Sequence, residues 1–190
     1  MKLFIDNEQC NTSSILAHYR TPRIEGESVT LELSLALQEK ANWCWAAIVL
    51  SLADYFDLGA CSQSGIAGLC EPDANKDRQN GERLPLNQAL DAVGCQYYWT
   101  PGKPSFPRLM AQINHGLPLC ARIQWHCGLG HFVLIYGYQA SPQMLWVADS
   151  NDGSSLQGFN DFPKNYGNRS GVWTETYWML RPGEKADELF

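Results

Sequence analysis

The sequence lacks any apolar run of roughly 20 residues, the length that a membrane-spanning helix needs, so we expect no membrane span. It is also poor in basic residues: 14 Lys and Arg stand against 20 Asp and Glu, which gives a formal net charge of -6. Nucleic-acid binding depends on clustered positive charge, and no Lys/Arg cluster occurs, so we expect no nucleic-acid partner. Internal repeats and low-complexity tracts are missing too, which excludes repeat proteins and fibrous proteins.

The 190 residues are 45% hydrophobic and 12% aromatic, which predicts a folded domain with a substantial core rather than a disordered chain. The N-terminal residues do not resemble a signal peptide. Met1 to Asp6 hold one Lys and three apolar residues before the acidic one, which is too short for the apolar core of such a leader. We therefore expect a cytoplasmic protein, or one that is secreted or delivered into a target cell by a leaderless route.

Seven cysteines are present, an odd number, so at least one is free unless it pairs between chains. We expect most of them to be small buried side chains in a reducing compartment, with Cys61 and Cys70 as the first pair to test for a disulfide. Cys120, His126 and Cys127 could also be read as a metal cluster, with Cys61 and Cys70 as further ligands. Because no Cys-x-x-Cys spacing supports that reading, we expect neither a metal nor a cofactor.

Hydrophobic periodicity changes along the chain from the helical to the strand type. The predicted helices cover residues 43–56, 63–69, 85–93 and 105–115, and the predicted strands cover 28–33, 119–125, 131–138, 144–149 and 172–180. Residues 150–171 are rich in Asn, Gly and Ser, which predicts a long loop and a candidate lid. This order predicts an α+β fold, with an N-terminal arm over residues 1–35 and one domain over residues 36–190.

Cys44 lies at the start of the strongest predicted helix, for which Asn42 is the expected N-cap. The unpaired N–H groups of a first helical turn favour a thiolate, and a thiolate attacks carbonyl carbons. Gln38 lies six residues earlier, so its amide N–H can reach over the helix start. Together with the backbone N–H of Cys44, it would stabilise the oxyanion of a tetrahedral intermediate.

His131 is the best candidate for the base that a nucleophilic cysteine needs, because it opens a strong predicted strand. The other histidines, His18, His115 and His126, lie in the arm, near a helix end and in a predicted turn. A short connection joins strands 131–138 and 144–149 into an antiparallel hairpin, which brings Asp149 at the open end beside His131. A carboxylate there would accept the second imidazole N–H and orient the ring.

These residues together resemble the papain-like cysteine peptidases. The resemblance rests on Gln38 with Cys44-Trp45-Ala46-Ala47, on the strand 131–138 and on Val147-Ala148-Asp149. It covers about residues 36–180 and is to the compact bacterial branch, which includes type III effector proteases of plant pathogens and bacteriocin-leader peptidases. It implies a helical half and a twisted antiparallel half with the active-site cleft between them. It also implies an oxyanion donor at Gln38, a nucleophile at Cys44, a base at His131 and an orienting group at Asp149.

The sequence departs from the family pattern at two points. Lysosomal-type members carry Cys-Gly-Ser-Cys-Trp around the nucleophile, and here Ala41 stands at the first of these positions, so their local disulfide is missing. The orienting residue is Asp rather than Asn, which leaves Asn151 and Asp152 as rivals for Asp149. Trp125, just before the turn that leads to the base, is a candidate cover for the hydrogen bond between base and orienting group.

We therefore predict a cysteine endopeptidase that needs no cofactor and acts on a peptide or protein substrate. A cognate inhibitor or immunity protein is a further candidate partner. The role expected is that of a bacterial effector, a toxin or a maturation protease. A glutamine deamidase or transpeptidase would use the same triad, and a catalytically silent peptide-binding module would keep the same fold, so both alternatives stay open.

Overall fold

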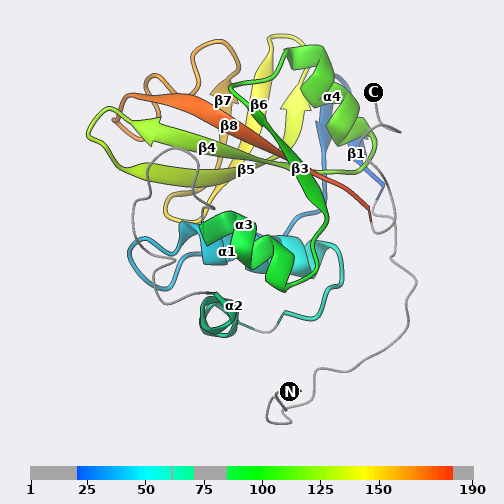
Figure 1. The fold of residues 1–190 in the computed structure, drawn as a ribbon. Coiled ribbons are helices and arrows are strands. Elements are labelled where there is room, and N and C mark those ends of the chain that lie inside the picture. Colours follow the sequence, from blue (N-terminus) through cyan, green and yellow to red (C-terminus); the bar gives the residue numbers. More distant parts are fainter. Residues whose placement is uncertain (1–20, 61, 71–84, 182–190) are drawn as a thin grey trace.

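An eight-stranded antiparallel sheet separates one helix from the other three in the computed structural model, which describes residues 21–60, 62–70 and 85–181. Figure 1 shows three of the helices below the sheet and the fourth above it. The helices are α1 (Cys44–Tyr55), α2 (Gln63–Leu69), α3 (Pro85–Ala92) and α4 (Phe106–Asn114). The predicted α+β fold is confirmed, and each of the four predicted helices is found within a residue or two of its expected bounds.

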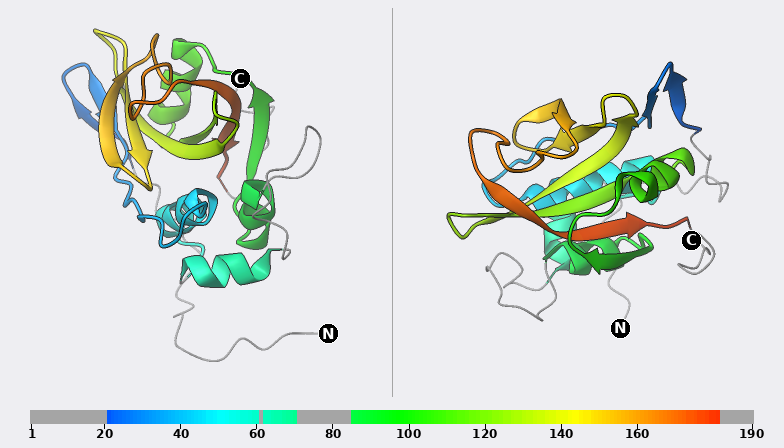
Figure 2. Two further views of the ribbon diagram at one scale, coloured as in Figure 1. Left: turned by 90° about the vertical axis from the view of Figure 1, so that its left-hand side faces the viewer. Right: turned by 90° about the horizontal axis from the view of Figure 1, so that it is seen from above.

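The sheet follows the order β1-β2-β5-β4-β8-β3, and β6 joins it by pairing with β5 and with β7. Seen from the side, the strands curl above α1, α2 and α3 (Figure 2). The strands are β1 (Arg23–Glu25), β2 (Ser28–Thr30), β3 (Tyr97–Pro101), β4 (Leu119–Trp125), β5 (Gly130–Gln139), β6 (Met144–Asp149), β7 (Gly153–Gly158) and β8 (Gly171–Met179).

Two apolar cores lie on the two faces of the sheet. Helix α1 is central to the lower core, because ten of its 12 residues are buried between the sheet, α2 and α3. Helix α4 packs its buried face, including Leu109 and Ile113, on the opposite side of the sheet. Burial on all sides explains why the α1 sequence is apolar around most of its circumference rather than on one stripe. This packing fixes where the first residue of α1 lies relative to β5.

Three short strands were not predicted. The loop predicted over residues 150–171 is wrong over β7, whose sequence Gly-Ser-Ser-Leu-Gln-Gly has little strand propensity and pairs with β6 through its backbone. Strand β3 lies between two predicted helices. Its aromatic residues Tyr97, Tyr98 and Trp99 are typical of a strand. Strand β1 has only three residues, all exposed, so no apolar pattern marks it.

The predicted N-cap at Asn42 is also wrong. Trp43 is the capping residue of α1, and no side chain makes a capping hydrogen bond to the helix. Asn42 instead has a positive φ of 65°, in the left-handed region that asparagine tolerates better than most residues, and lies in the turn before the helix. The side chain of the capping residue therefore leaves the first N–H groups of α1 uncapped.

Part of the predicted N-terminal arm belongs to the sheet. Strand β2 pairs with β5, with Ser28 opposite Gln139 and Thr30 opposite Gly137. The division between an arm over 1–35 and a domain over 36–190 stays a prediction. His18 and Cys61 lie outside the described residues, so the disulfide between Cys61 and Cys70 also stays a prediction. Across the described ranges, no helix is both long enough and apolar enough to cross a membrane.

Candidate active site

Cys44 and His131 come together because α1 packs against β5. Cys44 is the first residue of α1 and His131 is the second residue of β5. Both side chains are largely buried, and the Cys44 thiol lies close enough to the His131 imidazole to raise the pKa of the ring. The structure therefore brings the predicted nucleophile and the predicted base together.

Asp149 holds the other nitrogen of the imidazole. The Nε2 atom of His131 donates to Oδ1 of Asp149 at 2.9 Å, and the Asp149 side chain is only 1% exposed. The predicted hairpin is responsible, since β5 and β6 pair antiparallel and the Asp149 end lies beside the start of β5. Because Nε2 faces the carboxylate, Nδ1 is the nitrogen that faces the thiol. This arrangement holds the ring in one orientation.

His131 and Asp149 shift each other's pKa values toward their charged forms. Burial alone would lower the pKa of His131, but the hydrogen bonds to Asp149 and Cys44, with the charges of both groups, raise it to about 10. Burial would likewise raise the pKa of Asp149, and the hydrogen bond and positive charge of His131 lower it instead. The imidazole is therefore positively charged and the carboxylate negatively charged at neutral pH.

Asp149 receives two further hydrogen bonds that were not predicted. The backbone N–H of Asn151 donates to Oδ1 at 2.8 Å, and the hydroxyl of Tyr166 donates to Oδ2 at 2.8 Å. Burial and the negative charge of Asp149 raise the pKa of Tyr166, which keeps its hydroxyl protonated as a donor. Tyr166 lies in the polar stretch that was predicted to be a loop, and its sequence surroundings carry no signal of this contact.

An aromatic stack covers the hydrogen bond between His131 and Asp149. The rings of Trp125 and His131 are stacked with centroids 6.2 Å apart, and Tyr166 stacks on the same indole at 6.3 Å. The predicted cover by Trp125 is confirmed. Each of His131, Asp149, Tyr166 and Trp125 therefore contacts two of the other three. Such a cover excludes water from the ion pair and strengthens its electrostatic interaction.

Gln38 is tied to the strand end that carries Asp149. Its backbone N–H donates to the Ser150 carbonyl at 2.9 Å, and its Oε1 accepts from the Ser150 hydroxyl at 3.1 Å. Its Nε2 donates to the Lys40 carbonyl at 3.2 Å. The amide oxygen is thus turned toward Ser150 and the amide nitrogen toward the turn before α1. Ser150 was not predicted, because 112 residues separate it from Gln38 in the sequence.

The rival residues lie elsewhere or have other partners. His115 is the C-cap residue of α4, and its carbonyl accepts a hydrogen bond from Arg181. His126 is exposed in the turn between β4 and β5. The side-chain amide of Asn151 donates to Asp152 at 2.8 Å on the exposed surface rather than to His131. His131 with Asp149 is the one histidine–carboxylate pair in hydrogen-bond contact within the described ranges.

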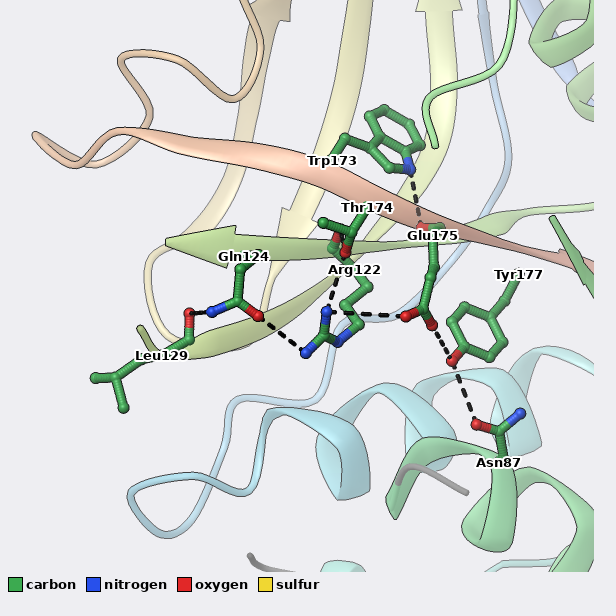
Figure 3. Close-up of polar contacts among 8 residues, drawn as sticks. All are labelled: Asn87, Arg122, Gln124, Leu129, Trp173, Thr174, Glu175 and Tyr177. Carbon is green, nitrogen blue, oxygen red and sulfur yellow. Dashed lines mark hydrogen bonds and ion pairs between the residues drawn. The ribbon is translucent and has the colours of Figure 1, made fainter. Parts of the chain in front are cut away.

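A polar cluster supports the turn before His131. Figure 3 shows it on the β4 and β8 strands, on the side that faces α1 and α3. Arg122 lies 3.8 Å from Glu175 and donates to Gln124 at 3.0 Å, and Gln124 donates to the Leu129 carbonyl at 3.3 Å. The cluster continues from Glu175 to Tyr177, whose hydroxyl donates to it at 2.8 Å.

Among the residues that the structure describes, the cysteines show no grouping of the kind that binds a metal. Cys120 is fully buried, whereas His126 and Cys127 are exposed in the turn after β4. Within residues 21–60, 62–70 and 85–181, no three His, Cys, Asp or Glu side chains lie close enough to share a metal ion.

Comparisons with known proteins concern the family and the fold. A family model described as papain-like cysteine protease AvrRpt2 matches residues 26–167. Among solved structures, the fold is similar to that of a double glycine motif protease from an AMS/PCAT transporter, which was crystallised in complex with the leader peptide. The TM-score is 0.54 at 14% sequence identity, over 83% of this chain and 96% of that one. No curated protein matches the sequence.

Proposed function

Since the chain belongs to the papain-like cysteine protease family of AvrRpt2, we propose that it cleaves peptide bonds with Cys44 as nucleophile, His131 as acid and base, and Asp149 as orienting group. One observation carries the proposal. A thiol at a helix start and a buried carboxylate both act on one imidazole: Cys44 lies close enough to raise the pKa of His131, and Asp149 is hydrogen-bonded to it. The contact at 2.9 Å between His131 and Asp149 is the part that orients the base.

The first half of the reaction forms an acyl-enzyme. The Cys44 thiolate attacks the carbonyl carbon of the scissile bond, and the electron pair of the carbonyl moves onto oxygen. When the tetrahedral intermediate collapses, the C–N bond breaks and the His131 imidazolium gives its proton to the leaving amine. The raised pKa of His131 keeps this proton available at neutral pH.

The second half uses the same groups in the opposite direction. Neutral His131 takes a proton from a water molecule, whose oxygen attacks the thioester carbon. The C–S bond then breaks, a carboxylic acid leaves and the imidazolium–thiolate pair is restored. Asp149 stabilises the imidazolium in both halves and keeps Nδ1 turned toward the reacting atoms.

We assign the oxyanion site to the Gln38 amide and the Cys44 backbone N–H. Two observations support this assignment. The capping residue Trp43 makes no side-chain hydrogen bond to the first N–H groups of α1. The Ser150 hydroxyl donates to the amide oxygen of Gln38, so the amide nitrogen faces the turn before α1, where one of its two N–H groups donates to the Lys40 carbonyl. Loss of one such donor typically costs about 2.7–4 kcal/mol of barrier.

The substrate proposed is a peptide or protein. The structurally similar double glycine motif protease was solved with a leader peptide, and an endopeptidase of that kind needs no cofactor. The roles of bacterial effector, toxin or maturation protease, and a cognate inhibitor, remain predictions from the resemblance.

A proteome-derived peptide library, followed by mass spectrometry, tests the proposal. The wild-type protein should split a subset of peptides at defined bonds, and Cys44→Ala should split none. Cys127→Ala is the matched control, because Cys127 is an exposed thiol in a turn, and it should behave as wild type. Splitting by Cys44→Ala would overturn the triad. A mass shift without scission would indicate deamidation, and joined peptides would indicate transpeptidation.

A further inference from the structure

The position of Gln38 is set by a second glutamine. We propose that Gln63, the first residue of α2, is a positioning residue that holds Gln38 at the oxyanion site; this rests on the role proposed above for Gln38. Gln63 is only 2% exposed. The proposed reaction does not use Gln63. A buried primary amide is expected to have hydrogen-bond partners that explain its presence.

The two partners of Gln63 are the peptide groups on either side of Gln38. Its Nε2 donates to the Leu37 carbonyl at 2.6 Å, and its Oε1 accepts from the Glu39 N–H at 3.1 Å. A primary amide supplies a donor and an acceptor from one planar group. Both contacts together define the direction of the main chain at the residue between them, and so the direction in which the Gln38 side chain leaves it.

Helix α2 gives Gln63 a rigid base. Ser62 caps the helix by accepting from the Gly65 N–H at 3.0 Å. Ile66 on the same helix is 2% exposed and packs in the core that contains α1. The amide that holds the Gln38 segment is therefore fixed to the same core as the nucleophile Cys44. Catalytic groups need such support, because small displacements of a donor reduce its stabilisation of the transition state.

Gln38 is held from its other side by the sheet. The Ser150 carbonyl and hydroxyl bind its backbone N–H and its amide oxygen. The segment around Gln38 thus spans from α2 to the end of β6, with Gln63 fixing its main chain and Ser150 fixing the far end of its side chain. Gln63 restrains the peptide groups on both sides of Gln38, so loss of Gln63 leaves only the contacts with Ser150 and with the Lys40 carbonyl to hold the residue.

A buried glutamine could instead serve stability alone, and the chain offers a control for that role. Gln112 on α4 is 1% exposed, and its Nε2 donates to the Met179 carbonyl at 2.8 Å. It lies on the opposite side of the sheet, in the α4 layer. Gln112→Met removes a buried amide of the same kind without touching the Gln38 segment.

The experiment is a double-mutant cycle on a quenched fluorescent peptide made from the best-cleaved library member. Gln63→Met should lower kcat by about 10²-fold with little change in KM. In a Gln38→Ala background the same substitution should lower kcat by less than about twofold, because its effect acts through Gln38. Gln112→Met should lower the melting temperature and leave kcat close to wild type.

Gln63→Glu gives a second readout that does not depend on Gln63→Met being folded. The substituted carboxylate still accepts from the Glu39 N–H but has no proton for the Leu37 carbonyl. Once protonated, it regains one donor. The kcat of Gln63→Glu relative to wild type should therefore rise as the pH falls.

Different results would contradict the role of Gln63, the oxyanion assignment and the triad. Wild-type kcat in Gln63→Met, or an equal fold-loss in both backgrounds, would overturn the role of Gln63. Wild-type kcat in Gln38→Ala would overturn the oxyanion assignment itself, and cleavage by Cys44→Ala would overturn the triad.

Discussion

Ser150 binds Gln38 twice, through its carbonyl at 2.9 Å from the Gln38 N–H and through its hydroxyl at 3.1 Å from Oε1. Ser150 directly follows Asp149, so one strand end carries both the residue that orients His131 and the residue that orients Gln38. His131 and Gln38, the proposed base and the proposed oxyanion donor, are therefore held by adjacent residues at the end of β6 and in the turn after it.

Ser150→Ala should reduce kcat by about tenfold, because the Gln38 amide loses the donor that sets its orientation and can turn. The substitution leaves the backbone contact in place, so KM and stability should change little. Ser154→Ala, an exposed serine on β7, is the control. Steady-state kinetics on a cleaved peptide gives the measurement, and an unchanged kcat in Ser150→Ala would count against this orienting contact.

Asp149→Asn should move the alkaline limit of activity to lower pH. Burial lowers the pKa of His131, but the hydrogen bond and charge of the Asp149 carboxylate, together with those of Cys44, raise it from 6.5 to about 10. Peptide-bond cleavage needs protonated His131, so activity is lost as the pH rises through this pKa. Removal of the charge lowers that pKa and brings the loss to a lower pH. The measurement is the pH profile of kcat/KM. An alkaline limb at the same pH in Asp149→Asn and in the wild type would contradict the role of Asp149.

Tyr166→Phe should destabilise the protein by about 1.5–3 kcal/mol, the range for a hydrogen bond to a charged group. The ring that stacks on Trp125 is kept, and only the donor to Asp149 is lost. The depressed pKa of Asp149 contributes stability above pH 3.8 that is lost as the pH falls through its folded value. Without the Tyr166 donor that pKa rises, so acid unfolding should begin at higher pH.

Tyr138→Phe is the matched control for that experiment. The Tyr138 hydroxyl donates to the neutral amide oxygen of Asn114 at 2.8 Å. Its loss should cost less, about 1 kcal/mol, and leave the pH of acid unfolding unchanged. Urea unfolding at neutral and acidic pH distinguishes the two variants, and equal shifts in both would contradict a specific role for Tyr166.

Gly171→Ala should disturb the stack over His131. A Cβ at this position would lie 2.7 Å from a ring carbon of Trp125 and 2.9 Å from the Gln124 carbonyl oxygen, so the indole or the strand must move. We expect a loss of about 1–3 kcal/mol in the free energy of unfolding, together with a lower kcat. Gly68→Ala in α2 has open space and should not lower kcat. A fully active and stable Gly171→Ala protein would rule out this packing constraint.

Local patterns were enough to predict the contact between His131 and Asp149, because a short hairpin connection sets which residues face each other. The helix that carries Cys44 was also predictable from a local pattern, its continuous apolar run. Ser150 and Gln63 were not, since each contacts the segment around Gln38 across 24 or more residues of sequence, and a serine or a glutamine in a polar stretch has no periodic signal. Tyr166 is only 17 residues from Asp149, but it lies between β7 and β8, outside any strand, so no strand register places it. Strand β7 escaped prediction because its pairing depends on backbone groups that every sequence has.

The pairing of β2 with β5 has a consequence for the order in which the chain can assemble. Ser28 contacts Tyr138 across 110 residues of sequence, and all of α1, α2, α3 and α4 lie between them. During synthesis the N-terminal strand therefore emerges long before its partner exists, and it must wait for β5 to be made. The sheet is therefore not one continuous piece of chain, because α1, α2 and α3 lie between β2 and β3 in the sequence. We expect the protein to unfold in a single cooperative transition, and to fold slowly for its size because of these distant contacts.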